Sequence, residues 1–285
     1  MNLPLWLQFS LWTILISTPF YWTVYRSGGA QSERFERIFR RLMWIPGIVA
    51  FGMRVSLGLG FDDVRFGIGR SPGLLLVALL LPLVMEVLVV VTATRFGLAR
   101  LDHQVIAMAG GRVHISPSVR LVLGSGPQSG WKFALNLTAT VATAAFYMLV
   151  FSLLEEFGWR GFLQDRIMDS LGLSTGLLVG GLIWGLWHAP LVWMGYKFPD
   201  YPRLGALIYM PVFTISLAAV AGWLYWLSGS IWVPALLNAS VRVSALVSEA
   251  ALGEAGRSRR VRFVWLWLWA VAAGLVWALW RVSTF

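Results

Sequence analysis

The sequence contains no cysteine, which excludes disulfides, thiolate metal ligands and a cysteine nucleophile. Histidine is also scarce, with 3 residues in the chain, and no His-Glu-x-x-His sequence occurs. Catalytic zinc sites usually take three protein ligands from His, Cys and carboxylates. We therefore expect neither a metal nor any other cofactor.

Charged residues make up only 13% of the chain, whereas 58% of the residues are hydrophobic and the mean hydropathy is +0.71. This composition is typical of a polytopic membrane protein and not of a soluble domain. The net charge of +10 would suit nucleic acid, but the arginines cluster in short loops between apolar runs, as in membrane proteins. We expect a lipid bilayer around the protein and no nucleic-acid partner.

Several runs of mostly apolar residues are long enough to cross a bilayer, which takes roughly 17–25 helical residues. They lie at about 3–25, 43–60, 72–94, 131–154, 175–196, 204–227, 230–248 and 262–281. The sequence therefore predicts an all-α integral membrane protein, a bundle of about eight transmembrane helices.

The stretches between these runs suggest three parts within one integral protein. Residues 1–60 are expected to form N-terminal spans with a surface amphipathic helix, and residues 249–285 a basic loop and the last span. Between them, residues 61–248 form the core, which includes a polar loop at 96–130.

Two local patterns add detail to this division. Within 33–44, arginines occupy one helical face and apolar residues the other, which predicts a helix on the membrane surface. The apolar residues are Phe35, Ile38, Phe39 and Leu42. In the polar loop, apolar and polar residues alternate at 112–115 and 119–122, which predicts a small hairpin.

Two adjacent glutamates, Glu155 and Glu156, follow the apolar run 131–154. Carboxylates in or beside hydrocarbon are costly unless they are paired, hydrated or used. Arg160 lies four residues after Glu156, so these two side chains can form an ion pair on one helical face. Glu155 is then left for chemistry.

His188 lies in a later apolar run, 175–196. A neutral imidazole can orient or deprotonate water, and a carboxylate can share that proton. A single histidine at a helix end is also often structural, and the presence of the two glutamates is what favours a catalytic role. The same run carries the pairs Gly176/Gly180 and Gly181/Gly185, whose spacing predicts close packing of a neighbouring helix.

Asn238 and Arg242 lie four residues apart in the run 230–248, hence on one face of a helix. Both donate hydrogen bonds, and donors aimed at a reacting centre can stabilise a developing oxyanion. Equally, Arg242 can extend to the membrane interface while Asn238 binds a neighbouring helix. Both interpretations stay open.

Glu86, in the run 72–94, is a further carboxylate within the membrane. Arg54 in the second run is its expected partner, because an intramembrane charge usually needs an opposite charge nearby. This structural pairing is preferred over a direct catalytic role for Glu86.

Together these residues resemble a known family. Glu-Glu-x-x-x-Arg at 155–160, followed by Trp-x-x-x-His at 184–188, is similar to the first two motifs of the CPBP intramembrane proteases. That group contains CAAX-type prenyl-protein endopeptidases and bacterial abortive-infection-type membrane proteins. The segment 62–67 also resembles the short stretch that precedes the family's domain, so the likeness covers residues 60–245.

The resemblance implies that Glu155 and His188 activate a water that attacks a peptide carbonyl. Glu156 and Arg160 take the place of the supporting pair. The aromatic residue of the second motif is usually Phe and is Trp184 here, a mild change.

The last motif of the family departs further. It reads His-x-x-x-Asn and is thought to help hold the oxyanion, whereas Asn238 and Arg242 occupy the two positions here. Since both residues still donate hydrogen bonds, the function can persist with altered geometry.

We therefore expect a metal-independent intramembrane endopeptidase in a prokaryotic plasma (inner) membrane, acting on a membrane-associated peptide or protein. The altered last motif leaves an alternative of another class, a catalytically impaired member that serves as a membrane scaffold or immunity-type protein. A transporter is a third interpretation, disfavoured because the polar groups gather on three runs and no inverted repeat is visible.

Overall fold

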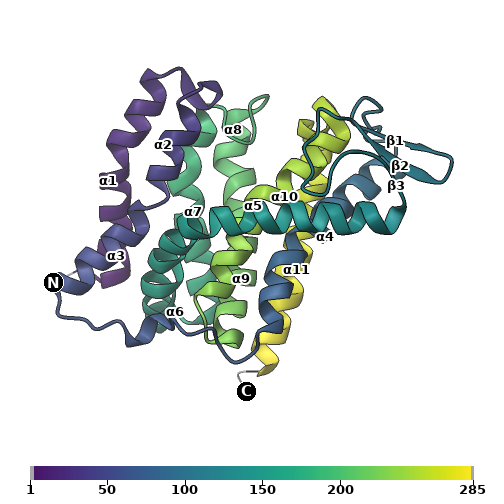
Figure 1. The fold of residues 1–285 in the computed structure, drawn as a ribbon. Coiled ribbons are helices and arrows are strands. Elements are labelled where there is room, and N and C mark those ends of the chain that lie inside the picture. Colours follow the sequence, from purple (N-terminus) through teal and green to yellow (C-terminus); the bar gives the residue numbers. More distant parts are fainter. Residues whose placement is uncertain (1–2, 284–285) are drawn as a thin grey trace. The chain divides into compact units, whose positions relative to one another are not determined.

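The computed structural model describes residues 3–283, most of which are helical (Figure 1). The helices are α1 Leu5–Arg26, α2 Phe35–Leu42, α3 Ile45–Ser56, α4 Gly73–Arg95, α5 Gly130–Gly158, α6 Asp165–Leu171, α7 Leu173–Trp193, α8 Pro202–Leu204, α9 Met210–Ser228, α10 Trp232–Leu252 and α11 Arg259–Ser283. Short 3₁₀ turns lie at Gly29–Gln31, Asp62–Val64 and Gly253–Arg257, and π-helical segments are η3 Trp159–Gln164 and η4 Gly205–Tyr209.

Within residues 3–283, six helical stretches are long and apolar enough to cross a membrane. They are Gly73–Arg95, Gly130–Leu171, Leu173–Trp193, Pro202–Ser228, Trp232–Arg257 and Arg259–Val282. This confirms the all-α integral membrane fold. Helices α1 and α3 are not among the six. α1 has 22 residues but is less apolar than the six stretches, and α3 has only 12 residues. At 1.5 Å per residue α3 is too short for a hydrocarbon layer of about 30 Å, so the prediction of a span at 43–60 is wrong.

The chain divides into two compact units. The first unit comprises residues 3–74, 150–235 and 269–283 of the described chain, and the second comprises 75–149 and 236–268. The two glutamates of the first motif and the histidine of the second therefore belong to the same unit.

In the first unit, α7 packs closely against α9 and α6 (Figure 1). A Cβ added to Gly181 would lie 2.5 Å from Ile215 Cα, and one added to Gly185 would lie 2.5 Å from Thr214 Oγ1, both on α9. A Cβ on Gly176 would lie 2.8 Å from Met168 Cα on α6. The close approach predicted from the glycine spacing is confirmed.

α2 forms where the amphipathic pattern predicts a helix. Its apolar face is buried within the protein, and the rings of Phe35 and Phe39 lie 5.5 and 5.0 Å from the ring of Tyr196. The apolar face of α2 thus packs on protein and not on lipid.

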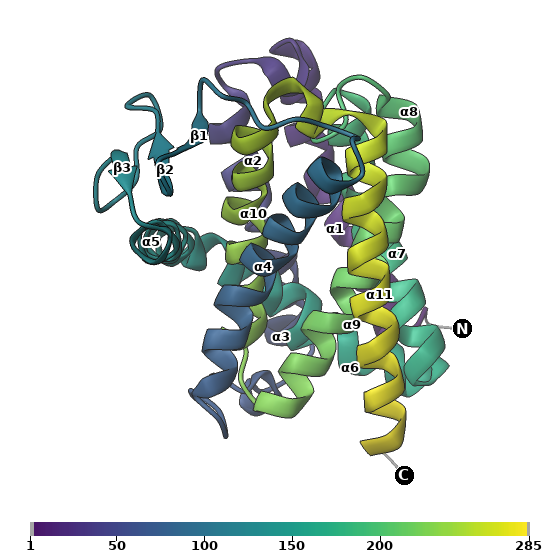
Figure 2. The ribbon, with the colours of Figure 1, turned by 90° about the vertical axis from the view of Figure 1, so that its right-hand side faces the viewer.

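The second unit carries a small antiparallel sheet of strands β1 Ile106–Ala109, β2 Arg112–Ile115 and β3 Gly126–Gln128, in that order (Figure 2). Gly110 and Gly111 join β1 to β2 with φ of 57° and 70°, values that suit glycine in a two-residue hairpin turn. The hairpin at 112–115 is confirmed, but 119–122 is not a strand. The N–H of Val122 donates to Thr140 Oγ1 on α5 (3.0 Å), so it is not available to a strand partner.

The predicted pairing of Glu86 with Arg54 is wrong, because each has other partners. Glu86 accepts hydrogen bonds from Ser248 Oγ and from Trp265 Nε1, the latter at 2.8 Å, all within the second unit. Arg54 binds the carboxylate of Asp63 at 2.7 Å in the first unit.

The helix contact at Gly181 gives a testable prediction. Gly181→Ala should destabilise the protein by about 1–3 kcal/mol, as overpacking of a tight contact does. Gly180→Ala is the matched control, because its Cβ would meet Ile167 Cγ2 at 3.8 Å, an ordinary contact. Thermal unfolding in detergent measures both variants. Equal effects of the two substitutions would contradict the packing described.

Candidate active site

Glu155 and Glu156 lie at the end of α5, immediately before the π-helical segment η3, and both side chains are 0% exposed. A π-helical turn is rare and often marks a functional position, because it re-aims side chains relative to a regular helix. Two fully buried carboxylates require compensating donors or charges. Each of the two glutamates receives a different kind of compensation.

Glu155 is held by two tryptophans. Its Oε1 accepts hydrogen bonds from Trp184 Nε1 on α7 at 2.9 Å and from Trp159 Nε1 on η3 at 3.4 Å. The indole N–H groups stabilise a buried carboxylate without neutralising its charge. Their bonds also fix the direction in which the carboxylate points.

Glu156 is paired with a cation, as its spacing to Arg160 predicted. Arg160 Nη1 lies 2.8 Å from Glu156 Oε2, and both side chains are buried. The guanidinium also lies 4.6 Å from the centre of the Trp184 ring, within the range of a cation–π interaction. The ion pair is therefore confirmed, and Arg160 also touches a residue that binds Glu155.

His188 is buried on α7, and its Nδ1 lies 3.0 Å from the main-chain oxygen of Trp184. Because a carbonyl oxygen only accepts, Nδ1 carries the hydrogen, and in the neutral ring Nε2 then carries the lone pair. Trp187 packs edge-on against the imidazole with 4.7 Å between ring centres. Trp184 thus contacts Glu155 through its indole and His188 through its carbonyl.

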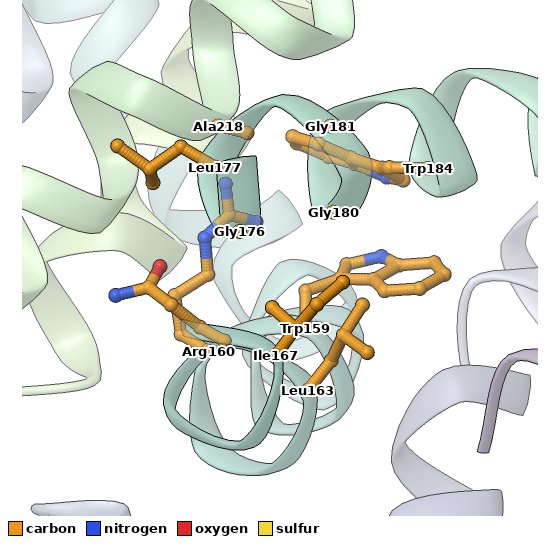
Figure 3. Close-up of a pocket in the computed structure, with 11 residues that line it drawn as sticks. Trp159, Arg160, Leu163, Ile167, Gly176, Leu177, Gly180, Gly181, Trp184 and Ala218 are labelled. Carbon is orange, nitrogen blue, oxygen red and sulfur yellow. The ribbon is translucent and has the colours of Figure 1, made fainter. Parts of the chain in front are cut away.

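A small cavity lies beside these residues, between η3, α6, α7 and α9 (Figure 3). It has about 20 Å³ of space, enough for roughly one water molecule. Figure 3 shows Trp159 and Trp184 on opposite sides of it, with the guanidinium of Arg160 pointing towards α7. The glycines at 176, 180 and 181 form part of its wall.

The first unit thus brings together Glu155, Glu156, Arg160 and His188 around Trp184. Asn238 and Arg242 lie on α10 in the second unit, four residues apart, and their role towards an oxyanion stays a prediction.

The sequence interpretation missed the two tryptophans as ligands of Glu155. Trp159 lies four residues after Glu155, a spacing that could have indicated the contact. The sequence suggests only a mild change from Phe at Trp184, although Trp, unlike Phe, offers an N–H donor.

Carboxylate and imidazole groups are potential metal ligands when at least three of them lie close together. Among residues 3–283, no three His, Asp or Glu side chains group closely enough to hold a metal ion. Structural and catalytic zinc sites usually need at least three such ligands. Independence from metal stays a prediction.

The apolar helices define an integral membrane protein, and its first unit contains a buried polar site. Residues 136–244 match the family described as type II CAAX prenyl endopeptidase Rce1-like. CAAX prenyl protease 2 of Methanococcus maripaludis is 27% identical over 75 residues. That alignment covers 26% of this chain and 28% of the relative, so the chain spans little more than a quarter of the relative's length.

The matched segment contains every residue proposed from the motifs, from Glu155 to Arg242. The resemblance to the CPBP/CAAX protease family that the motifs indicate is therefore confirmed over residues 136–244. At the level of the family, this supports a membrane protease.

The buried ion pair gives the second prediction. Arg160→Ala should lower stability by roughly 3–5 kcal/mol, because it leaves the charge of Glu156 buried without its partner. The double variant Glu156→Gln/Arg160→Gln should recover part of that loss, since it removes both charges. Thermal unfolding of the two single Gln variants and the double variant completes the cycle. Purely additive effects would show that the two side chains do not interact.

Proposed function

We propose that the protein is an intramembrane endopeptidase that hydrolyses a peptide bond of a membrane-associated protein or peptide with a water activated by Glu155. The observation that carries the proposal is the position of Trp184, which binds Glu155 with its indole and His188 with its carbonyl. The proposed general base, Glu155, and the imidazole of His188 thus both bind Trp184. A prokaryotic plasma membrane is the proposed location.

In the proposed reaction, Glu155 removes a proton from water as the water oxygen attacks the peptide carbonyl carbon. A C–O bond forms and the carbonyl oxygen becomes an oxyanion, which Asn238 and Arg242 are proposed to stabilise as donors. When the intermediate collapses, the C–N bond breaks and the leaving amine takes the proton, with His188 orienting the water or sharing that proton. The sum is hydrolysis, with the base restored.

Glu156 and Arg160 are proposed to support Glu155. The positive charge of Arg160 compensates Glu156, which is adjacent to the base. Without Arg160, Glu155 would lie beside a second buried carboxylate that lacks its arginine partner, an arrangement that is costly.

The alternative is a catalytically impaired member that serves as a membrane scaffold or immunity-type protein. Asn238 and Arg242 stand where the family resemblance implies His and Asn, and this departure is what favours it. A cleavage assay separates the two. Suitable substrates are membrane-associated peptides, including prenylated C-terminal peptides suggested by the name of the archaeal relative.

The third prediction tests the base. Glu155→Gln keeps the shape of the side chain and can still accept from the indoles, but it cannot take a proton, so turnover should fall by roughly 10²–10⁴-fold. Glu36→Gln is the control, because Glu36 is exposed on α2. Cleavage of library peptides in detergent is the measurement. A Glu155→Gln protein with wild-type cleavage would remove Glu155 from the mechanism.

The fourth prediction concerns metals. Since Glu155 is proposed to activate water by itself, dialysis against EDTA or phenanthroline should leave the cleavage rate unchanged. Metal analysis of the purified protein accompanies the assay. Stoichiometric zinc that is lost together with activity, and restores activity when added back, would falsify the proposal of a metal-free site.

A further inference from the structure

Two arginines from outside the π-helical segment η3 bind its main chain. The carbonyl oxygen of Gly161 accepts from Arg54 Nη2 on α3 at 2.5 Å, and that of Phe162 accepts from Arg166 Nη1 on α6 at 2.9 Å. Asp63 joins the two arginines. Its carboxylate binds Arg54 through both oxygens, at 2.7 and 2.9 Å, and lies 3.6 Å from Arg166.

These bonds follow from the geometry of a π-helical turn. Its hydrogen bonds run to the fifth residue along the chain, so carbonyl groups at the change of register lose their regular partners. Buried carbonyl groups need donors from elsewhere. Gly161 and Phe162 are both buried, and Arg54 itself is 0% exposed. Arg54 thus supplies a donor that the helix itself does not.

α3 also contacts the chain on both sides of the glutamate pair. A Cβ on Gly47 would lie 2.4 Å from the main-chain oxygen of Leu154, the residue before Glu155. A Cβ on Gly158 would lie 2.5 Å from the main-chain carbon of Pro46. The backbones of the two segments are in direct contact at these points, with no side chain between them. A displacement of α3 would therefore displace the turn that carries Glu155.

The loop that carries Asp63 is anchored in turn. Tyr225 Oη on α9 donates to the main-chain oxygens of Asp63 and Val64, at 3.1 Å each. Burial by itself would raise the pKa of Asp63, but the hydrogen bonds and charge of Arg54, together with the charge of Arg166, lower it below its ordinary value. Asp63 is therefore ionised at neutral pH and able to hold both arginines.

We propose that Arg54, oriented by Asp63, is a positioning residue for Glu155: it fixes the carbonyl of Gly161 and thereby the turn that presents the base. This inference rests on the proposed function. Arg54 and Asp63 lie outside residues 136–244, so part of the proposed active site depends on a segment that the family match does not include.

The fifth prediction compares Asp63→Asn with Asp62→Asn. Asp63 is half-exposed, so its Asn variant should fold, and it removes the charge that orients Arg54. Asp62 is the matched control, because it is the neighbouring residue and its side chain is exposed. Hydrogen exchange followed by mass spectrometry should show faster exchange of the amides at 159–165 in Asp63→Asn alone. Peptides from α9 should not change.

Kinetics on a cleaved peptide give the second readout. Misplacement of a catalytic group by about 1 Å can cost ~10²-fold, so Asp63→Asn should lower kcat by about 10–100-fold with KM nearly unchanged. Arg54→Lys keeps the charge but offers no guanidinium fork, and it should show the same pattern.

The outcomes separate the inference from the proposed function. Unchanged exchange at 159–165 in both Asp63→Asn and Arg54→Lys would overturn the positioning role. Faster exchange throughout the first unit, with kcat per folded molecule unchanged, would also overturn it and leave only a structural role. If the wild-type protein cleaves no peptide, the proposed function fails, and exchange at 159–165 alone decides whether Arg54 holds the turn.

Discussion

The burial of two adjacent carboxylates in an apolar protein is the constraint that organises the first unit. Glu155 and Glu156 are both 0% exposed, and the surrounding residues offset the free-energy cost of burying two charges in two ways. Arg160 compensates one charge with its own, and the indoles of Trp159 and Trp184 donate to the other. Glu156 therefore takes part in an ion pair, whereas Glu155 accepts hydrogen bonds from two indoles. The difference between the two glutamates is therefore chemical as well as geometric.

Trp184 connects the parts of this cluster. Its indole binds Glu155, its ring faces the guanidinium of Arg160 and its carbonyl receives the hydrogen of His188 Nδ1. A Phe at this position, usual in the resembling family, could make only the second and third contacts. The glycines of α7 contribute to this cluster indirectly. They let α6 and α9 approach α7 closely, and η3, which leads directly into α6, is thereby held near Trp184. Helix packing and the polar site thus depend on one another.

The N-terminal segment has an unexpected part in this arrangement. α3 is too short to cross a membrane, and it packs on the turn that carries the glutamates through Gly47, Gly158 and Arg54. The π-helical register explains why a buried arginine is needed there, since it leaves carbonyl groups without partners in their own helix. The reacting groups are proposed from the likeness to the CPBP/CAAX protease family, and the contacts of α3 indicate how this chain holds them in place.

Local spacing and hydropathy were sufficient for much of this protein. They predicted an all-α membrane fold, the hairpin at 112–115, the packing of the glycine pairs and the ion pair of Glu156 with Arg160, because each depends on residues a few positions apart. The partners of Arg54, Glu86 and Glu155 could not be predicted in this way. Arg54 binds Asp63 and a main-chain carbonyl and not Glu86. Glu155 accepts hydrogen bonds from indoles of η3 and α7. These contacts form only between buried groups that packing brings within about 3 Å, the length of a hydrogen bond. Only the tertiary structure decides which groups those are.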